Sequence, residues 1–159
     1  MNQITDHEDY VHLGIAQALK ILGFNWECNH YYCPGENGNN EFISSHDTIY
    51  PGEVVGQYII TPESLMDDWN STEDCCSAPT LYVAQKWIRE IKGLDLYVLP
   101  TIVEYGEIKY RWIIRRPEGW KLNVGEEQYE AKPEEYSDTY EDSLSNGLCK
   151  CLALLILKK

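Results

Sequence analysis

Apart from Ile113, apolar and basic side chains alternate between residues 108 and 115, and this pattern constrains the fold more than any other feature of the chain. Successive side chains of a strand point to opposite faces of its sheet, so this strand has one apolar face and one positively charged face. Residues 94–103 also alternate, which predicts a hairpin over 94–115, or 94–116 with its last arginine. Pro100 favours an edge position or a bulge, because proline has no N–H to donate. The predicted apolar face consists of Leu94, Leu96, Val98, Ile102, Ile108, Tyr110, Trp112 and Ile114.

Three further segments have the spacing of apolar residues that is typical of amphipathic helices. They are predicted at about 10–22, 78–92 and 140–157. Helices of this kind bury one face, and a sheet with an apolar face is the natural partner. The residues predicted to cap them are Asp9, Ser77 and Thr139 at the starts, with Gly23 and Gly93 after the first two ends.

The remaining β structure is predicted to be short. Residues 24–60 form an irregular β region, with a turn at 34–40 and a strand at 54–60. Residues 120–124 are predicted as a short third strand beside the hairpin. The order of elements predicts an α+β fold, in which a small antiparallel sheet is packed by two or three amphipathic helices. The length of 159 residues suits a single domain over 1–159.

The chain is strongly acidic, with 26 Asp and Glu against 13 Lys and Arg and a formal net charge of −13. Such a charge repels nucleic acids and anionic membranes, so neither is expected as a partner. The sequence begins without a signal-peptide pattern, and its longest apolar run, 151–157, is far short of the roughly 20 residues that span a bilayer. We therefore expect a cytoplasmic protein whose six cysteines are reduced thiols or metal ligands rather than disulfides.

Cys28, His30 and Cys33 place three zinc-binding side chains within six residues. Thiolate and imidazole suit zinc, which takes four tetrahedral ligands, and Cys75 or Cys76 is available as the fourth. The alternative is that these cysteines are small buried hydrophobic residues. A cysteine nucleophile is a further hypothesis, with His12, His30 or His46 as its partner.

A basic strip on the hairpin stands out in an acidic chain. It consists of Lys109, Arg111, Arg115 and Arg116. These side chains are suited to a phosphate or an acidic partner, and nearby aromatic residues would add stacking surfaces for a single-stranded nucleic acid. We favour pairing within the protein, with the acids of 126–135, because opposite charges on neighbouring strands attract.

Several stretches resemble a family of small uncharacterised proteins from Bacteroides-type bacteria and their tailed phages. They are AQALKILGFNWEC at 16–28 with the two tyrosines that follow, SAPTL at 77–81, QKWIRE at 85–90 and TYEDSL at 139–144. The resemblance implies a phage or mobile-element setting, and it assigns no activity, cofactor or catalytic residue. The chain departs from the pattern at Gly147, Cys149 and Cys151. A glycine inside a helix costs about 1 kcal/mol relative to alanine.

The sequence contains no P-loop, dinucleotide-binding or nucleophile-elbow motif, and no catalytic residue is assigned. Five tryptophans and twelve tyrosines are many for this length, and aromatic residues anchor protein interfaces as well as cores. The first hypothesis is therefore a non-enzymatic accessory protein that binds another protein or a second copy of itself. The alternatives are a small zinc- or cysteine-dependent protein centred on Cys28, His30 and Cys33, and a nucleic-acid binder that uses the basic strip.

Overall fold

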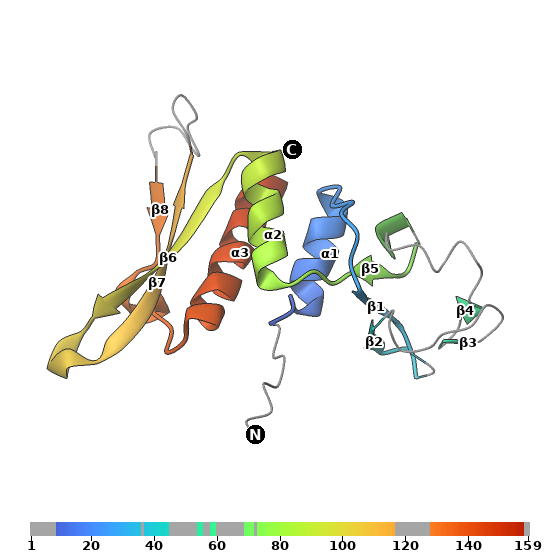
Figure 1. Ribbon diagram of the computed structural model, residues 1–159, viewed down its shortest axis with the longest axis horizontal. Coiled ribbons are helices and arrows are strands. Elements are labelled where there is room, and N and C mark those ends of the chain that lie inside the picture. The colour runs from blue at the N-terminus through green and yellow to red at the C-terminus, as the bar shows by residue number, and fades with distance from the viewer. Residues whose placement is uncertain are drawn as a thin grey trace, which may run out of the picture.

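The computed structural model describes residues 9–35, 37–44, 54–55, 58–59, 69–71, 73–116 and 128–157. Its helices lie between two antiparallel sheets that occupy opposite ends of an elongated molecule (Figure 1). The helices are α1 (Leu13–Ile21), α2 (Leu81–Trp87) and α3 (Tyr140–Ile156). The predicted α+β fold is confirmed. In the part of the chain that is described, no helix is both long and apolar enough to cross a membrane.

The predicted hairpin is the central feature of the larger sheet. Strands β6 (Asp95–Ile102) and β7 (Ile108–Arg115) pair along their whole length, from Asp95 opposite Arg115 to Ile102 opposite Ile108. The third strand is β8 (Gln128–Glu130), which pairs with β7. The third strand predicted at 120–124 lies outside the described residues. The strand order is therefore β6-β7-β8, with β7 in the middle.

The alternation along the hairpin sets the two faces of this sheet as predicted. Trp112 and Ile114 are buried beneath α3, whereas Arg111 and Arg115 lie on the other face. The expectation that the whole apolar face is covered was wrong at its far end, because Ile102 and Ile108 are 77% and 59% exposed. These two residues lie beyond the stretch that α3 covers.

Gly147 allows α3 to approach the sheet closely. A Cβ atom at this position would lie 2.6 Å from Leu96 Cδ1 and 2.9 Å from Trp112 Cβ. Both distances are shorter than real Cβ contacts, so only glycine fits without a shift of the helix. The helix-propensity cost expected from the sequence thus accompanies tight packing of α3 against β6 and β7.

Strand β6 forms one edge of the sheet, and its free side is protected. Val103 N donates to Glu107 O at 2.9 Å, and the alternation of an antiparallel ladder then directs the backbone groups of Leu96, Val98 and Pro100 away from β7. Proline has no N–H at this position, which confirms the predicted edge placement of Pro100. The side chain of Gln85 on α2 donates to Leu96 O at 2.8 Å.

The helix caps differ in part from those expected. α1 begins at Leu13 rather than Tyr10, because the cap is the His12 side chain and not Asp9. α2 is capped by Thr80, whose Oγ1 accepts from Val83 N, and the predicted cap Ser77 is instead a buried strand residue. One turn of π-helix, Ile88–Lys92, follows α2. The predicted caps that are confirmed are Thr139 before α3, and Gly23 and Gly93, which have left-handed backbone angles.

The smaller sheet is built from the irregular β region. Strands β1 (His30–Pro34) and β2 (Asn40–Ser44) form a hairpin around the predicted turn, and β5 (Cys76–Ser77) pairs with β1 on the other side. The single strand predicted at 54–60 is instead two short paired strands, β3 (Val54–Val55) and β4 (Tyr58–Ile59).

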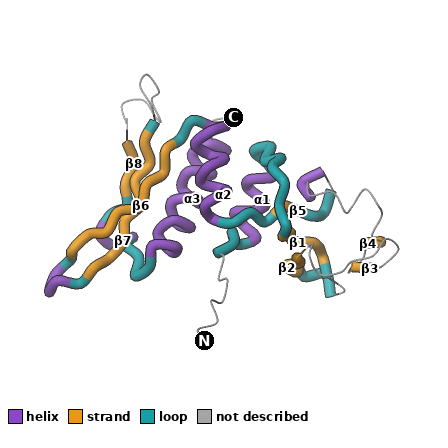
Figure 2. The backbone as a smooth tube through the Cα atoms, viewed as in Figure 1, coloured by secondary structure: helices purple, strands orange, loops and turns teal. Residues whose placement is uncertain are grey.

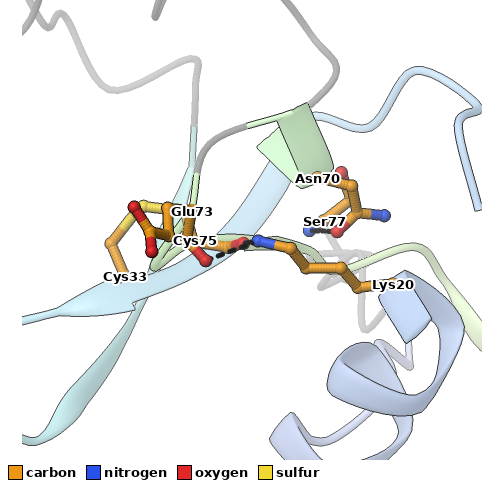
Figure 3. The surroundings of a disulfide bond; sticks show 6 residues. All are labelled: Lys20, Cys33, Asn70, Glu73, Cys75 and Ser77. Atoms are coloured by element: carbon orange, nitrogen blue, oxygen red, sulfur yellow. Dashed lines mark hydrogen bonds between the residues drawn. A yellow bond between two sulfur atoms is a disulfide. The ribbon is translucent and has the colours of Figure 1, made fainter.

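A disulfide joins Cys33 to Cys75, so the expectation of reduced cysteines was wrong at these two positions. The pairing of β1 with β5 places Tyr32 opposite Cys76, which brings the neighbouring Cys33 and Cys75 face to face with their Cα atoms 4.4 Å apart. Lys20 reaches this place from α1 and donates to the backbone oxygen of Cys75 at 2.6 Å (Figure 3). The same ammonium donates to Glu73 O at 2.8 Å.

Candidate functional site

The end of the β6–β7 hairpin projects clear of the helices (Figures 1 and 2). We call residues 99–111 the arm. Val98 and Trp112, which flank it, are the last residues of each strand that are buried on the inner face, the face that α3 covers. The start of α3 reaches this face only at Tyr110, whose ring contacts Tyr140, and beyond that point Ile102 and Ile108 are exposed. The arm is therefore held at its base and open at its end.

The inner face of the arm is apolar. Ile102 and Ile108 lie opposite each other in the ladder and so present their side chains together. Tyr105 occupies the turn between the strands and is completely exposed. Its backbone is left-handed, with φ 63°, followed by Gly106 with φ 80°. A left-handed backbone costs a non-glycine residue about 1–2 kcal/mol, so the turn holds an aromatic side chain outward at some expense.

At the base of the arm, aromatic rings continue this surface across to the helices. The ring of Tyr110 meets that of Tyr140, the first residue of α3, edge to face with centroids 6.2 Å apart. Tyr140 in turn stacks with Tyr82 of α2 at 6.4 Å. The Tyr82 hydroxyl donates to Glu141 at 3.4 Å. Desolvation and the Glu141 carboxylate raise the pKa of Tyr82, which keeps this hydroxyl protonated.

The charges around the inner face are negative. Glu104 and Glu107 are exposed on either side of the tip. Glu141 and Asp142 form the acidic first turn of α3 at the base. Asp138 lies nearby but pairs with Lys109, so its charge is compensated. The inner face of the hairpin itself carries apolar, proline and tyrosine side chains only, at even-numbered positions from 96 to 102 and from 108 to 114.

The basic strip is largely engaged within the protein. Arg111 Nη1 lies 3.1 Å from Glu130 Oε2 on β8, and Arg115 Nε donates to Gln128 Oε1 at 2.9 Å. Lys109 pairs with Asp138, and this bond raises the pKa of the ammonium. Pairing inside the protein was the favoured interpretation, and it is confirmed for Arg111 with an acid of 126–135.

Arg116 does not belong to the same surface. It is 9% exposed, and desolvation lowers its pKa. The expectation of four basic residues on one strand face was wrong here, because Arg116 follows Arg115 at the end of β7 and so projects to the other side.

The residues proposed for zinc have different surroundings in the structure. Cys33 is bonded to Cys75 and is not available as a thiolate in the oxidised chain. Cys28 is buried, and its Sγ lies 3.5 Å from Trp26 O. The ring of His30 packs in a cluster with the rings of Tyr10 at 4.1 Å and Phe42 at 5.0 Å. In the described ranges, no group of three His, Cys, Asp or Glu side chains is arranged to hold a metal ion.

A cysteine–histidine contact occurs where the sequence did not place one. His12 Nε2 lies 3.5 Å from Sγ of Cys149 on α3. His12 Nδ1 accepts from Ile15 N as the cap of α1, so a neutral ring carries its proton on Nε2. That nitrogen donates to the sulfur and cannot remove its proton. Burial also raises the pKa of Cys149. This pair is therefore not an activated nucleophile.

Of the other predicted partners for a nucleophile, His46 lies outside the described residues.

Comparison of the chain with protein-family models, with curated proteins and with solved structures finds no match.

The arm is the feature that sequence reasoning missed. Alternation predicted that Ile102 and Ile108 share a face with Trp112, but alternation does not say where the covering helix ends. Two signals were present in the sequence. Pro100 interrupts the donor pattern of β6, and the Tyr-Gly turn at Tyr105 places an aromatic residue where turns commonly carry small polar ones.

Proposed function

We propose that the protein acts by binding another protein through the arm and catalyses no reaction of its own. The earlier resemblance adds the proposal of an accessory role in a phage or mobile-element setting. The observation that carries the proposal is the open inner face of the arm, where Ile102 and Ile108 are exposed, together with the fully exposed Tyr105 in the turn at the same projecting end (Figure 1).

The energetic argument is that this arrangement gains little for the isolated chain. Burying a large aliphatic side chain contributes about 1.5–3 kcal/mol, and the arm forgoes that gain at Ile102 and Ile108. Single exposed apolar residues are ordinary, whereas several together on a projecting element are typical of interaction sites. The left-handed backbone of Tyr105 adds a conformational cost at the same place. A partner that buries these side chains would supply the missing hydrophobic gain and so offset the conformational cost of the turn.

The alternatives have weaker support. Nucleic-acid binding by the basic strip requires free cations, and Lys109 and Arg111 already have carboxylate partners. The zinc site proposed at Cys28, His30 and Cys33 requires Cys33 as a thiolate, and Cys33 is half of a disulfide.

A photoreactive amino acid at position 105 tests the proposal in the cells that produce the protein. We expect a covalent adduct with another protein on illumination. The matched control places the same group at Tyr97, which is exposed on the outer face of β6. The adduct at position 105 should disappear when Ile102 and Ile108 are changed to serine. Equal adducts from both positions, or no adduct from position 105, would contradict the proposal.

A further inference from the structure

We infer that the inner face of the arm, together with the tyrosines at its base, docks a basic amphipathic segment of another protein. This inference rests on the proposed function and adds the chemistry of the partner. The docking surface is the set Ile102, Ile108, Tyr110, Tyr140 and Tyr82.

The docking surface extends in two directions, along the strands of the arm and across the ends of two helices. The arm carries the surface outward along the strands, and Tyr140 and Tyr82 carry it across the ends of α3 and α2. The ring contacts from Tyr110 to Tyr140 and from Tyr140 to Tyr82 make it continuous. An occupant of this surface contacts strand and helix ends at once, as a helix or an extended segment with one apolar face would.

The charge of the occupant follows from the acids at both ends of the surface. Glu104 and Glu107 stand at the tip, and Glu141 and Asp142 stand at the base. The cations Lys109, Arg111 and Arg115 of β7 lie on the opposite face of the sheet, and Lys109 and Arg111 are paired with acids. Arg116, which follows β7, is buried. A segment with lysine or arginine beside its apolar residues therefore finds complementary charge at each end.

The same charges argue against a second copy of this chain as the occupant. Each copy carries a formal charge of −13, and two arms that met face to face would bring their glutamates together. Like charges at an interface oppose association, and the effect is largest at low salt.

The test uses synthetic peptides and the full chain. The probe is a leucine–lysine peptide of about 18 residues, which is five turns of an amphipathic helix. One comparison peptide replaces leucine with glutamine and keeps the lysines, and another replaces lysine with glutamate. We expect the leucine–lysine peptide to bind at least tenfold more tightly than either, because only it offers both an apolar face and positive charge.

Matched variants separate docking on this surface from general attraction to an acidic protein. I102S/I108S should weaken binding of the leucine–lysine peptide by about tenfold or more, and circular dichroism should show an unchanged fold because both residues are exposed. E104Q/E107Q should weaken binding several-fold and flatten its salt dependence. The control E90Q/D95N removes the same charge from the π-helical turn after α2 and from the first residue of β6, and it should leave binding unchanged.

The outcomes distinguish this inference from the proposed function. If I102S/I108S or E104Q/E107Q binds the leucine–lysine peptide as tightly as the parent chain, or if E90Q/D95N weakens binding equally, the inference is overturned. The proposed function survives that result as long as the adduct at position 105 forms. If the adduct joins two copies of this chain and sedimentation shows an arm-dependent dimer, a second copy replaces the basic segment and the inference is also overturned.

Discussion

The two sheets of the molecule are held together by different means. The helix-covered sheet, β6-β7-β8, contributes Leu96, Trp112 and Ile114 to a core shared with the apolar stripes of the helices. The disulfide end, which comprises β1, β2, β5 and residues 69–71, has a separate buried cluster of Tyr31, Cys33, Trp69 and Cys75. The described part of the first region contains no disulfide, whereas the second adds a covalent bond to a cluster of four residues. A small apolar cluster supplies little stability without such a staple.

The small cluster nevertheless has good local geometry. The rings of Tyr31 and Trp69 stack with centroids 3.6 Å apart. Asn70 ties the neighbouring backbone together, because its side chain donates to Phe24 O at 2.7 Å and accepts from Ser77 N at 2.9 Å. Lys20 adds its two bonds from α1. The disulfide end thus combines one covalent bond with side-chain bonds to the backbone, whereas the helix-covered sheet combines the larger buried core with pairs such as Arg111–Glu130.

Removal of the disulfide should break this contrast most strongly. C33A/C75A opens a link across a sequence separation of 42 residues, which is worth about 4 kcal/mol in the chain-entropy model. We expect amide exchange in β1, β2 and β5 to become much faster while β6 and β7 stay protected. The control C149A removes a cysteine that takes no part in the disulfide and should leave the exchange of β1, β2 and β5 unchanged. Equal loss of protection in both sheets would show that they unfold as one unit.

Gly147→Ala should damage the other region instead. The added methyl group meets Leu96 and Trp112, and overpacking of this kind costs about 2 kcal/mol even after the gain in helix propensity. Denaturant unfolding with tryptophan fluorescence measures the loss. The control S145A, on the same helix, should be neutral or stabilising. A stability equal to that of the parent chain would mean that α3 can move away from the sheet at no cost.

Lys20→Met tests the connection between the two regions. The substitution keeps an apolar stem and removes the ammonium that donates to Glu73 O and Cys75 O. Loss of hydrogen bonds from a charged donor should cost about 1.5 kcal/mol, felt as faster opening of the disulfide end. Limited proteolysis of the two proteins at equal concentration checks this. Lys86→Met on α2, where the ammonium is exposed, serves as the control. The protease should cleave this variant at the same rate as the parent chain.

The smallest effect is expected at the outer face of the helix-covered sheet. A double-mutant cycle of R111A and E130A should give a coupling of about 0.5 kcal/mol, because both side chains are partly exposed. The coupling should shrink further at high salt. A coupling of several times this size, insensitive to salt, would make the basic strip a structural element in its own right.

Sequence reasoning succeeded where one local pattern decided the structure. The alternation from 108 to 115 fixed which residues of β7 face α3, because a period of two leaves only two choices. Gly23, Gly93 and Thr139 were predicted correctly for a similar reason, since their roles depend on a few neighbouring residues.

Prediction from the sequence failed where the structure depended on contacts between distant parts of the chain. The Cys33–Cys75 bond depends on the register of β1 against β5, which no local pattern states. The role of Gly147 depends on how closely α3 approaches Leu96. The exposure of Ile102 depends on where α3 begins relative to the hairpin, and this is why the arm was not foreseen.

The protected edge of β6 has a consequence for how the protein behaves when it is crowded. A strand arriving from a neighbouring molecule would meet no N–H at Pro100 and a carbonyl at Leu96 that Gln85 already occupies. We therefore expect concentrated solutions to resist the growth of fibres by edge-to-edge stacking, even though the hairpin exposes isoleucines at its end. Recognition at this hairpin then depends on side chains, which can distinguish one binding partner from another.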